Sequence, residues 1–581
     1  MHGVTTAQLH EIDGIHDGLV CPTEDERQTL RRIADDIPWN AYLIALVELA
    51  ERFSFYGAGV VFTNFVQFPL PLGSSTGAGL RDGQSGALGK GQRASTAISI
   101  FYVLWCNLTP LVGAYVADVH LGRFDTVCVA VFIALVGHII LIIAAIPGVI
   151  EQTDTSLLIF LVAIVITGLG TGLFKANIST LVAEQYKRTK MFVITTASGE
   201  QVIVDPALTI SRIYMYFYLL INLGALLGQI GMTYSEKYVG FWLAYTLPTV
   251  VFLLCPIILV IGRNRYIRAP PTGSVLATFF LLFRFAARGR WSANPLRTWR
   301  NFSAPGFWDA ARPSRIRAAA RPVWMTFDDA WVDEVDRGLK ACAVFAWFPL
   351  YWLAVSQMNN NLTSQAATMT TDGLPNDILS NIDPLALIVF IPLCDFFVYP
   401  ALQRWRIRFT ALKRITAGFL VGATAMVWAA LLQYNIYQTN PCHYAAATCR
   451  DAAQRPLVSP LSVWMQAPAY LLIALSEILA SITGFQYAFQ MAPTNMRSLV
   501  MALFILTTAV SAVLGEAFLW LSADPLLVWN YTVMGALAGG GGCAFWLSVR
   551  RLDAQEDAMH NLAPGQLEGH PGDPEELELE G

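Results

Sequence analysis

Residues 460–490 read PLSVWMQAPAYLLIALSEILASITGFQYAFQ, and Glu477 is the only acidic or basic side chain between Arg455 and Arg497. A bilayer span needs roughly 20 mostly apolar residues, so this stretch is long enough to cross a membrane. Backbone groups in lipid have to satisfy one another's hydrogen bonds, and a helix does so within one segment. The stretch therefore predicts a transmembrane helix that carries a single buried carboxyl group.

Stretches of this kind recur along the whole chain of 581 residues, of which 55% are hydrophobic and 14% charged. An ordinary soluble domain carries about 25% charged residues. We therefore predict an all-α membrane protein with twelve transmembrane helices. The predicted spans are 40–66, 94–118, 126–149, 157–183, 213–235, 239–262, 341–360, 383–403, 415–434, 460–490, 498–521 and 526–549.

The positions of the basic residues predict the orientation. Of the 38 Lys and Arg residues, only Arg52 and Lys175 fall within the predicted spans. Most of the others lie in loops that are cytosolic if the N-terminus is inside, as the positive-inside rule requires. We therefore expect both termini in the cytosol. Residues 1–37 lack an apolar stretch, so no cleavable signal peptide is expected.

The predicted spans divide six and six around a basic connector. The expected parts are a cytosolic N-terminal segment (1–39), an N-terminal six-helix bundle (40–262), a cytosolic connector (263–338), a C-terminal six-helix bundle (339–550) and an acidic, disordered cytosolic tail (551–581). Within the connector, Val275–Ala287 is apolar and then basic, which suits a helix lying on an anionic membrane surface. A solvated linker is the alternative. Cys442 and Cys449 share a predicted outer loop, and both a disulfide and two free thiols remain open there.

The first span holds a cluster of charges, Glu48-Leu-Ala-Glu51-Arg52-Phe-Ser-Phe55-Tyr56-Gly57. At about 100° per residue, Glu48, Glu51 and Arg52 share one helix face, with Tyr56 one turn beyond Arg52. Ionisable groups within a membrane are costly, so they indicate function by default. Two carboxylates beside one guanidinium form a proton switch, because protonation of a carboxyl would loosen the ion pairs and release Arg52. A purely structural ion network is the alternative.

Other polar residues within the spans each have a simpler explanation beside the functional one. Lys175 is alone in its span, and it either faces a site or extends toward the inner surface near Glu184. Glu477 stands far from any other charge in the sequence and reaches water only through a cavity. Asp383 precedes Pro384, which also suits a helix N-cap followed by an N1 proline. His138 suits a packed side chain, and Asn107, Asn222 and Gln357 suit hydrogen bonds between helices.

The chain contains no Gly-rich phosphate loop with its Lys-Ser/Thr, no metal-type cluster and no nucleophile triad. These features are those of an ATP-driven pump or an enzyme. We therefore expect a non-enzymatic membrane protein that needs no cofactor.

The first-span segment resembles the Glu-x-x-Glu-Arg-Phe-x-Tyr-Tyr-Gly motif of the proton-dependent oligopeptide transporter family, within the major facilitator superfamily. Phe55 replaces the first Tyr of that motif. Further resemblances follow in order along the chain, and they are Gly113–Thr126, Lys175-Ala-Asn177, Phe217–Gly224 and Ser476-Glu477. The segment Leu30–Trp39 and the Arg-rich connector resemble the fungal branch.

The resemblance implies two six-helix bundles that rock around a central cavity near the midplane. It implies that Arg52 and Lys175 bind a peptide's carboxylate, that Asn222 and Glu477 bind its ammonium group, and that Glu48 and Glu51 handle the proton. Tyr56, Gln357 and Asp383 are the other expected substrate-binding residues, and Asn107 and Phe504 are less central pocket positions. Asn107, Phe504 and Asp383 depart from the usual Tyr, Trp and Asn. The extra carboxylate of Asp383 would favour a substrate with an additional positive charge.

The leading hypothesis is proton-coupled uptake of di- and tripeptides across the plasma membrane by a monomer that contacts lipid and no nucleic acid. A second hypothesis keeps the mechanism and changes the cargo to nitrate or a specialised metabolite. The expected ammonium site at Glu477 and Asn222 argues against nitrate. A third is a peptide sensor that does not transport, and the intact Glu48–Glu51–Arg52 group argues against it.

Overall fold

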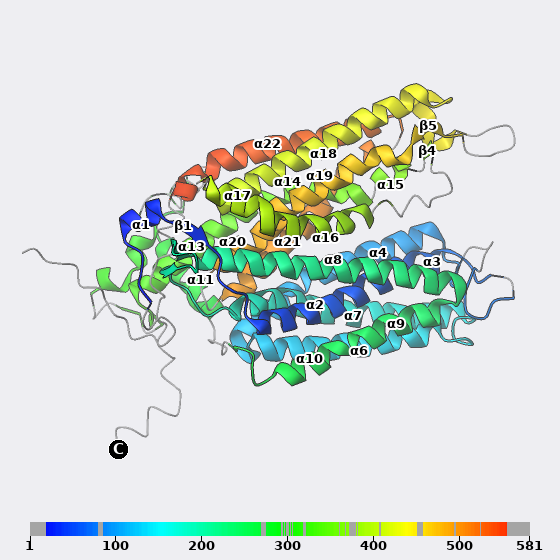
Figure 1. The fold of residues 1–581 in the computed structure, drawn as a ribbon. Coiled ribbons are helices and arrows are strands. Elements are labelled where there is room, and N and C mark those ends of the chain that lie inside the picture. The colour runs from blue at the N-terminus through cyan, green and yellow to red at the C-terminus, as the bar shows by residue number, and fades with distance from the viewer. Residues whose placement is uncertain are drawn as a thin grey trace, which may run out of the picture.

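The computed structural model describes residues 19–554, apart from 72, 80–84, 269–274, 292–293, 295–296, 298–300, 302–303, 305, 318–320, 323, 360, 367, 371–378, 380, 406–407, 450–456, 493–495 and 523. Its helices form two bundles that lie side by side (Figure 1). The predicted acidic tail lies almost entirely outside the described residues, which end at Ala554.

The first bundle contains α2 (Trp39–Val60), α3 (Phe62–Gln67), α4 (Gly91–Leu108), α5 (Pro110–Val116), the π-helical turn η1 (Ala117–Leu121), α6 (Arg123–Ala145), α7 (Thr153–Glu184), α8 (Pro206–Tyr238), α9 (Phe241–Phe252) and α10 (Leu254–Gly262). The second contains α13 (Asp329–Phe345), α14 (Phe348–Val355), the 3-10 turn η5 (Ser356–Asn359), α15 (Asn361–Ala366), α16 (Ile382–Leu393), the π-helical turn η7 (Cys394–Val398), α17 (Tyr399–Arg404), α18 (Ala411–Thr439), α19 (Ala467–Glu477), the π-helical turn η10 (Ile478–Ile482), α20 (Thr483–Met491), α21 (Arg497–Glu516) and α22 (Leu527–Ala554).

The helices confirm the predicted all-α membrane fold. Eleven helical stretches of the described residues are long and apolar enough to cross a membrane. The stretch of α2 is not among them, although its 22 residues are sufficient in length, because Glu48, Glu51 and Arg52 lie in its middle. The count of twelve therefore stays a prediction that depends on how the charges of α2 are accommodated.

Close packing of α2 against α8 explains several glycines of the sequence motifs. A Cβ atom on Gly224 would stand 2.5 Å from the Leu49 carbonyl oxygen, and one on Gly228 would stand 2.3 Å from that of Phe53. Gly57 faces the same helix, because its Cβ would meet the Gly228 oxygen at 3.2 Å. Side chains at these positions would force the two helices apart and displace the charged face of α2.

The two ends of the molecule differ in structure. At one end, which we call the connector end, lie α1 (Glu24–Thr29), α11 (Val275–Ala286) and a small sheet (Figure 1). Its strand β3 (Gln201–Val204) pairs parallel with β1 (Arg31–Ile33) and antiparallel with β2 (Phe192–Thr195).

The other end, which we call the disulfide end, carries the parallel strands β4 (Met369–Thr370) and β5 (Ser459–Ser462). The short 3-10 segment η8 (His443–Thr448) lies between Cys442 and Cys449, which form a disulfide. The structure thus decides between the two states that the sequence left open for these cysteines.

The connector has a core of its own. Leu282 and Ala286 of α11 are buried with Trp308, Trp331 and Val335, the last two from the first turns of α13. The solvated-linker alternative for this segment is therefore wrong. Phe280 is 63% exposed and Leu281 40% exposed on α11, and whether these side chains contact a membrane surface stays a prediction.

A buried charge cluster joins the two bundles near the connector end. Arg123 pairs with Asp118 at 3.1 Å and with Glu184 at 2.5 Å, and its Nε donates to Ser498 Oγ of the second bundle at 2.8 Å. Arg497 lies 3.5 Å from Glu184, and the Leu499 backbone N–H donates to Asp118 at 3.2 Å. Gly122, at φ +77°, lets the chain turn between η1 and α6 and so places Arg123 beside both acids.

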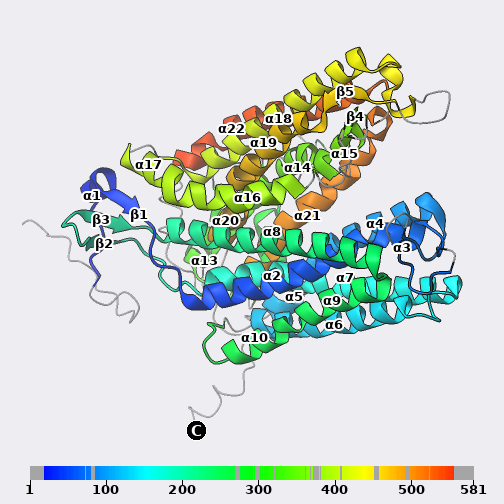
Figure 2. The ribbon, with the colours of Figure 1, turned by 45° about the vertical axis from the view of Figure 1, so that its right-hand side comes forward.

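Further contacts between the bundles run along the first third of α8. Arg212 and Tyr216 both bind Asp395 of η7, at 2.9 and 3.0 Å, and Arg414 of α18 donates to Ser211 at 2.9 Å. Toward the disulfide end of the same helix, Leu227 is 50% exposed and Tyr234 is 60% exposed. The ribbons of the two bundles accordingly converge toward α1 and β1 and diverge toward β4 and β5 (Figure 2). This conformation is held together at the connector end.

Arg123→Ala is expected to lower the thermal unfolding temperature of the purified protein in detergent by several degrees. The substitution leaves Asp118 and Glu184 buried without their shared cation, which costs about 3–5 kcal/mol. Arg263→Ala, at an exposed arginine of the same bundle, is the control and should leave the unfolding temperature unchanged. Equal unfolding temperatures for the two variants would contradict a stabilising role for the cluster.

Candidate functional site

The charged face of α2 is buried between helices. Arg52 is 4% exposed and lies 3.1 Å from Glu48 and 2.5 Å from Glu51. Glu51 also accepts a hydrogen bond from Thr171 of α7, at 3.1 Å. One guanidinium thus pairs with two carboxyl groups, and a proton added to either of them would change how strongly Arg52 is held.

Lys175 of α7 approaches the same cluster. Its Nζ lies 5.0 Å from the centre of the Phe55 ring, and the Arg52 guanidinium lies 4.9 Å from the same ring. Lys175 also donates to Asn107 Oδ1 at 3.3 Å. The alternative in which Lys175 extends toward Glu184 is wrong, because Glu184 pairs with Arg123 and Arg497 instead.

Two acidic side chains lie on the facing surface of the second bundle. Glu477 is 6% exposed and accepts a hydrogen bond from the Tyr218 hydroxyl of α8 at 2.6 Å. Asp383 is 4% exposed and lies within electrostatic range of Glu477. Its Oδ1 has no hydrogen-bond partner among the described residues.

The N-cap explanation of Asp383 is wrong. The helix α16 begins at Ile382, so Asn381 occupies the cap position and Asp383 lies inside the first turn without capping it. Its carboxyl group is therefore not used to end a helix. A buried and partly unsatisfied carboxyl costs free energy unless a partner completes it, and a cationic ligand would be such a partner.

Tyr56 lies near charged groups of both bundles. Tyr56 of α2 is within electrostatic range of Arg52 and also of Glu477. Asn222 lies one turn beyond Tyr218 and donates to the Tyr218 carbonyl oxygen at 2.9 Å. Arg52 and Lys175 belong to the first bundle, and Glu477 and Asp383 belong to the second. That these residues form one substrate site stays a prediction.

Three other residues have local packing roles. Gln357 donates to the Leu353 carbonyl oxygen at 3.1 Å and accepts from Asn361 at 2.6 Å. The ring of Phe504 packs 5.0 Å from those of Phe348 and Phe485. His138 is buried against Phe252, as expected for a packed histidine. These contacts do not join Gln357 or Phe504 to the charged groups, so the part of both residues in a site stays a prediction.

Sequence reasoning missed Tyr218 and Phe55. The Tyr218 hydroxyl links the two bundles through Glu477, and only its place four residues before Asn222 on a helix signalled that it faces the same way. Phe55 was noted as a departure from a motif, whereas the structure places its ring beside both cations. An aromatic ring three residues after an arginine on a helix is a usable signal for such a contact.

The π-helical turn η10 begins directly after Glu477. Such turns commonly occur at functional positions, because they widen the helix and redirect the side chains around them. Two other π-helical turns each contain an acidic residue, Asp118 in η1 and Asp395 in η7. Asp118 accepts a hydrogen bond from the Leu499 backbone N–H and Asp395 from Arg212, so each acid binds a residue of the other bundle.

Comparisons with known proteins agree with this architecture. A family model described as POT family matches residues 124–534. The peptide transporter PTR_B of Candidozyma auris is 41% identical over 93% of this chain and 87% of its own length. The probable peptide transporter ptr2 of Schizosaccharomyces pombe is 39% identical over 93% of this chain and 82% of its own length.

The crystal structure of the POT family transporter PepTSo resembles this chain with a TM-score of 0.60 and 20% identity, covering 90% of this chain and 99% of that one. At this identity the likeness shows the shared fold of two helical bundles. The family model and the fungal relatives show more, because they match most of the chain at substantial identity. This chain is a multi-pass membrane protein that belongs to the POT family of transporters.

Proposed function

We propose that the protein is a proton-coupled symporter that imports di- and tripeptides by alternating access. The names of its fungal relatives as peptide transporters support the cargo, and membership of the POT family supports the coupling to protons. We further propose a plasma-membrane location with the connector end in the cytosol. The disulfide at the opposite end supports this orientation, since disulfides persist in oxidising surroundings.

The observation that carries the proposal is the arrangement of opposite charges on two facing bundles. A short peptide is a zwitterion whose carboxylate and ammonium groups stand at opposite ends. Arg52 and Lys175 offer cations on one side, and Glu477 and Asp383 offer acids on the other. Such complementarity fixes the orientation of a peptide through its two charged ends. It places few requirements on the peptide's side chains, which favours broad selectivity.

The buried ion pairs of Arg52 supply a way to couple the proton. While both carboxyls are ionised, Arg52 is shared between Glu48 and Glu51. Protonation of one carboxyl weakens its hold on the guanidinium, which then binds the peptide carboxylate more strongly. Proton and peptide thus favour each other's binding, as linkage requires.

Alternating access needs a reversible barrier at each end. The contacts of Arg123, Asp395 and Arg414 close the connector end in this structure. Transport to the cytosol would break these contacts and bring the bundles together at the disulfide end.

Uptake of a labelled dipeptide into proteoliposomes tests the proposal. Imposing an acidic exterior should drive accumulation above the external concentration, and unlabelled di- and tripeptides should compete. Nitrate and free amino acids should not compete. Accumulation that is the same with and without the pH gradient would contradict the proposal. Competition by nitrate in place of peptides would also contradict it.

Asp383→Asn is expected to reduce the preference for a lysine-containing dipeptide over a neutral one by at least about tenfold, since 1.4 kcal/mol corresponds to tenfold. A carboxylate and an ammonium about 4 Å apart attract each other by several kcal/mol at intermediate dielectric, and asparagine removes most of that attraction. The measurement is competition between the two dipeptides for uptake. The neutral dipeptide is the internal control, because a purely structural role for Asp383 would lower uptake of both equally.

A further inference from the structure

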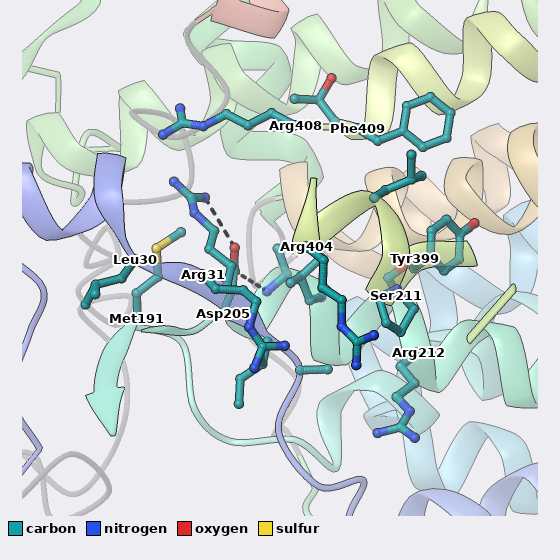
Figure 3. Close-up of a pocket in the computed structure, with 18 of the residues that line it drawn as sticks. Leu30, Arg31, Met191, Asp205, Ser211, Arg212, Tyr399, Arg404, Arg408 and Phe409 are labelled. Atoms are coloured by element: carbon teal, nitrogen blue, oxygen red, sulfur yellow. Dashed lines mark hydrogen bonds and ion pairs between the residues drawn. The ribbon is translucent and has the colours of Figure 1, made fainter. Parts of the chain in front are cut away.

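A cleft of about 1380 Å³ lies at the connector end, between the N-terminal segment and the second bundle (Figure 3). One wall comes from α1, β1 and the start of α8, and the other from η7, α17 and the start of α18. The predicted site residues Arg52, Lys175 and Glu477 do not line this cleft. It is therefore a separate feature of the structure.

The cleft is strongly basic. Eight of its lining side chains are Lys or Arg, and four are Asp or Glu. All four acids already form ion pairs with cations of the cleft, at nitrogen–oxygen distances from 2.9 to 3.5 Å. The lining also contains Arg27, Arg404, Arg408 and Arg414. Arg408 donates to the Arg27 carbonyl oxygen, Arg414 donates to Ser211 and Gln486, and Arg404 and Arg408 are exposed. The basic side chains around the cleft repel one another, so an anionic group bound in the cleft would be stabilised.

The described chain leads directly into this cleft. Asp553, in the last turn of α22, lines the cleft. Its carboxyl group lies 3.5 Å from Lys413 and accepts a hydrogen bond from Thr410. The described residues end one position later, at Ala554.

Residues 555–581 have the complementary charge. They contain eight Asp or Glu residues and no Lys or Arg, and five of these acids lie between Asp573 and Glu580. Twenty residues of chain span at most about 70 Å, so the acidic residues are near enough to Ala554 to reach the cleft. A segment tethered this closely has an effective concentration near its site of about millimolar.

We propose that the acidic segment 555–581 docks in this basic cleft and restrains opening of the connector end. The cleft is formed by parts of both bundles, since Ser211 and Arg212 belong to α8 and Arg404 belongs to α17. A polyanion bound to both walls stabilises the conformation in which they are close. It therefore slows the step that separates the bundles, whatever the cargo. An anionic lipid headgroup offers the same chemistry, but the segment is covalently attached at the cleft itself.

A photocrosslinking experiment on the full chain tests the contact independently of transport. A benzophenone amino acid replaces Leu577, which lies between Glu576 and Glu578, and the crosslinked residues are mapped by mass spectrometry. Crosslinks should fall on the cleft, within 27–34 or 395–414. They should drop about fivefold in the double variant Arg404→Gln/Arg408→Gln, because several exposed ion pairs are lost.

Arg263→Gln/Arg265→Gln is the matched control, since both arginines are exposed but do not line the cleft. It should keep the crosslink. Raising the ionic strength to about 0.5 M should weaken the crosslink of the unmodified cleft by screening. Crosslinks that map to other parts of the chain would overturn the proposal. A crosslink yield that is unchanged in the Arg404→Gln/Arg408→Gln variant would also overturn it.

Initial uptake rates give a second and functional readout. Neutralising the eight acids of 555–581 with Asn and Gln should raise the rate about threefold, and the Arg404→Gln/Arg408→Gln variant should do the same. Combining the two sets should give no further increase, because both remove one interaction. If the cleft variant alters the rate only in anionic liposomes and the tail variant has no effect, the occupant is lipid and the proposal is wrong.

Discussion

Arg52→Ala is expected to reduce uptake of an unmodified dipeptide by about 100-fold, because truncating one partner of a buried charge pair costs about 2–5 kcal/mol in binding and 1.4 kcal/mol corresponds to tenfold. Two separate losses contribute. Glu48 and Glu51 lose the cation that lies 3.1 and 2.5 Å from them, and the proposed peptide carboxylate loses its partner. The measurement is the initial rate of uptake into proteoliposomes at matched protein content.

A carboxylate-free substrate separates these two losses. The native protein should take up a dipeptide much faster than the same dipeptide with an amidated C-terminus, since an amide cannot replace the charge–charge contact. Arg52→Ala should lose this discrimination, whereas a merely structural role would lower both rates and keep their ratio. Arg188→Ala is the control, because Arg188 is 39% exposed and pairs with Asp35 away from the site. Its uptake and its discrimination should remain native.

Much of the fold could be predicted because lipid leaves the backbone few choices. Long apolar runs have to be helices. Each of the eleven observed stretches overlaps one of the predicted spans. Helix breaks were not predicted. The break between α4 and α5 lies at Thr109, just before Pro110, and that between α9 and α10 lies at Leu253. A hydropathy profile averages over many residues and does not show such a break. A proline acts at one position, because it removes a single backbone hydrogen-bond donor.

The site could be predicted only in part, because helical periodicity shows which residues of one helix share a face but not which residues of two helices meet. It places Glu48, Glu51 and Arg52 on one face, and the structure pairs them. It cannot say which residue of α8 meets Glu477, so the Tyr218 hydrogen bond came from the structure alone. Asp383 shows the opposite problem, since its sequence favoured a local cap and tertiary packing placed it beside another carboxyl group.

The basic cleft at the connector end could not be predicted at all. Its arginines come from the N-terminal segment, α8, α17, the chain that leads into α18 and the start of α18, which are far apart in the sequence. In the sequence they only mark cytosolic loops, as the positive-inside rule expects. Their convergence depends on the pairing of β1 with β3, which holds the N-terminal segment beside the start of α8. It also depends on Arg408, which donates to the Arg27 carbonyl oxygen at 3.2 Å from the side of the second bundle.

Glu51→Gln is expected to abolish accumulation of peptide against its gradient while preserving exchange of peptide across the membrane. A pH difference of about one unit stores about 1.4 kcal/mol per proton, enough for about tenfold accumulation for each proton carried. Glutamine has nearly the size of glutamate and retains an oxygen for the Thr171 hydroxyl, which lies 3.1 Å from Glu51. It carries no proton, so the variant resembles the permanently protonated state and its cycle no longer uses the pH gradient.

Two assays on the same proteoliposomes distinguish coupling from binding. Under an inward pH gradient, the variant should bring the internal peptide concentration only to the external one. In counterflow, with peptide preloaded and no pH gradient, it should exchange labelled peptide at a rate close to native. Glu236→Gln is the matched control, because Glu236 is another buried glutamate of the first bundle, hydrogen-bonded by Asn64 at 2.7 Å. Glu236→Gln should keep accumulation, and retained accumulation in Glu51→Gln would remove Glu51 from the proton path.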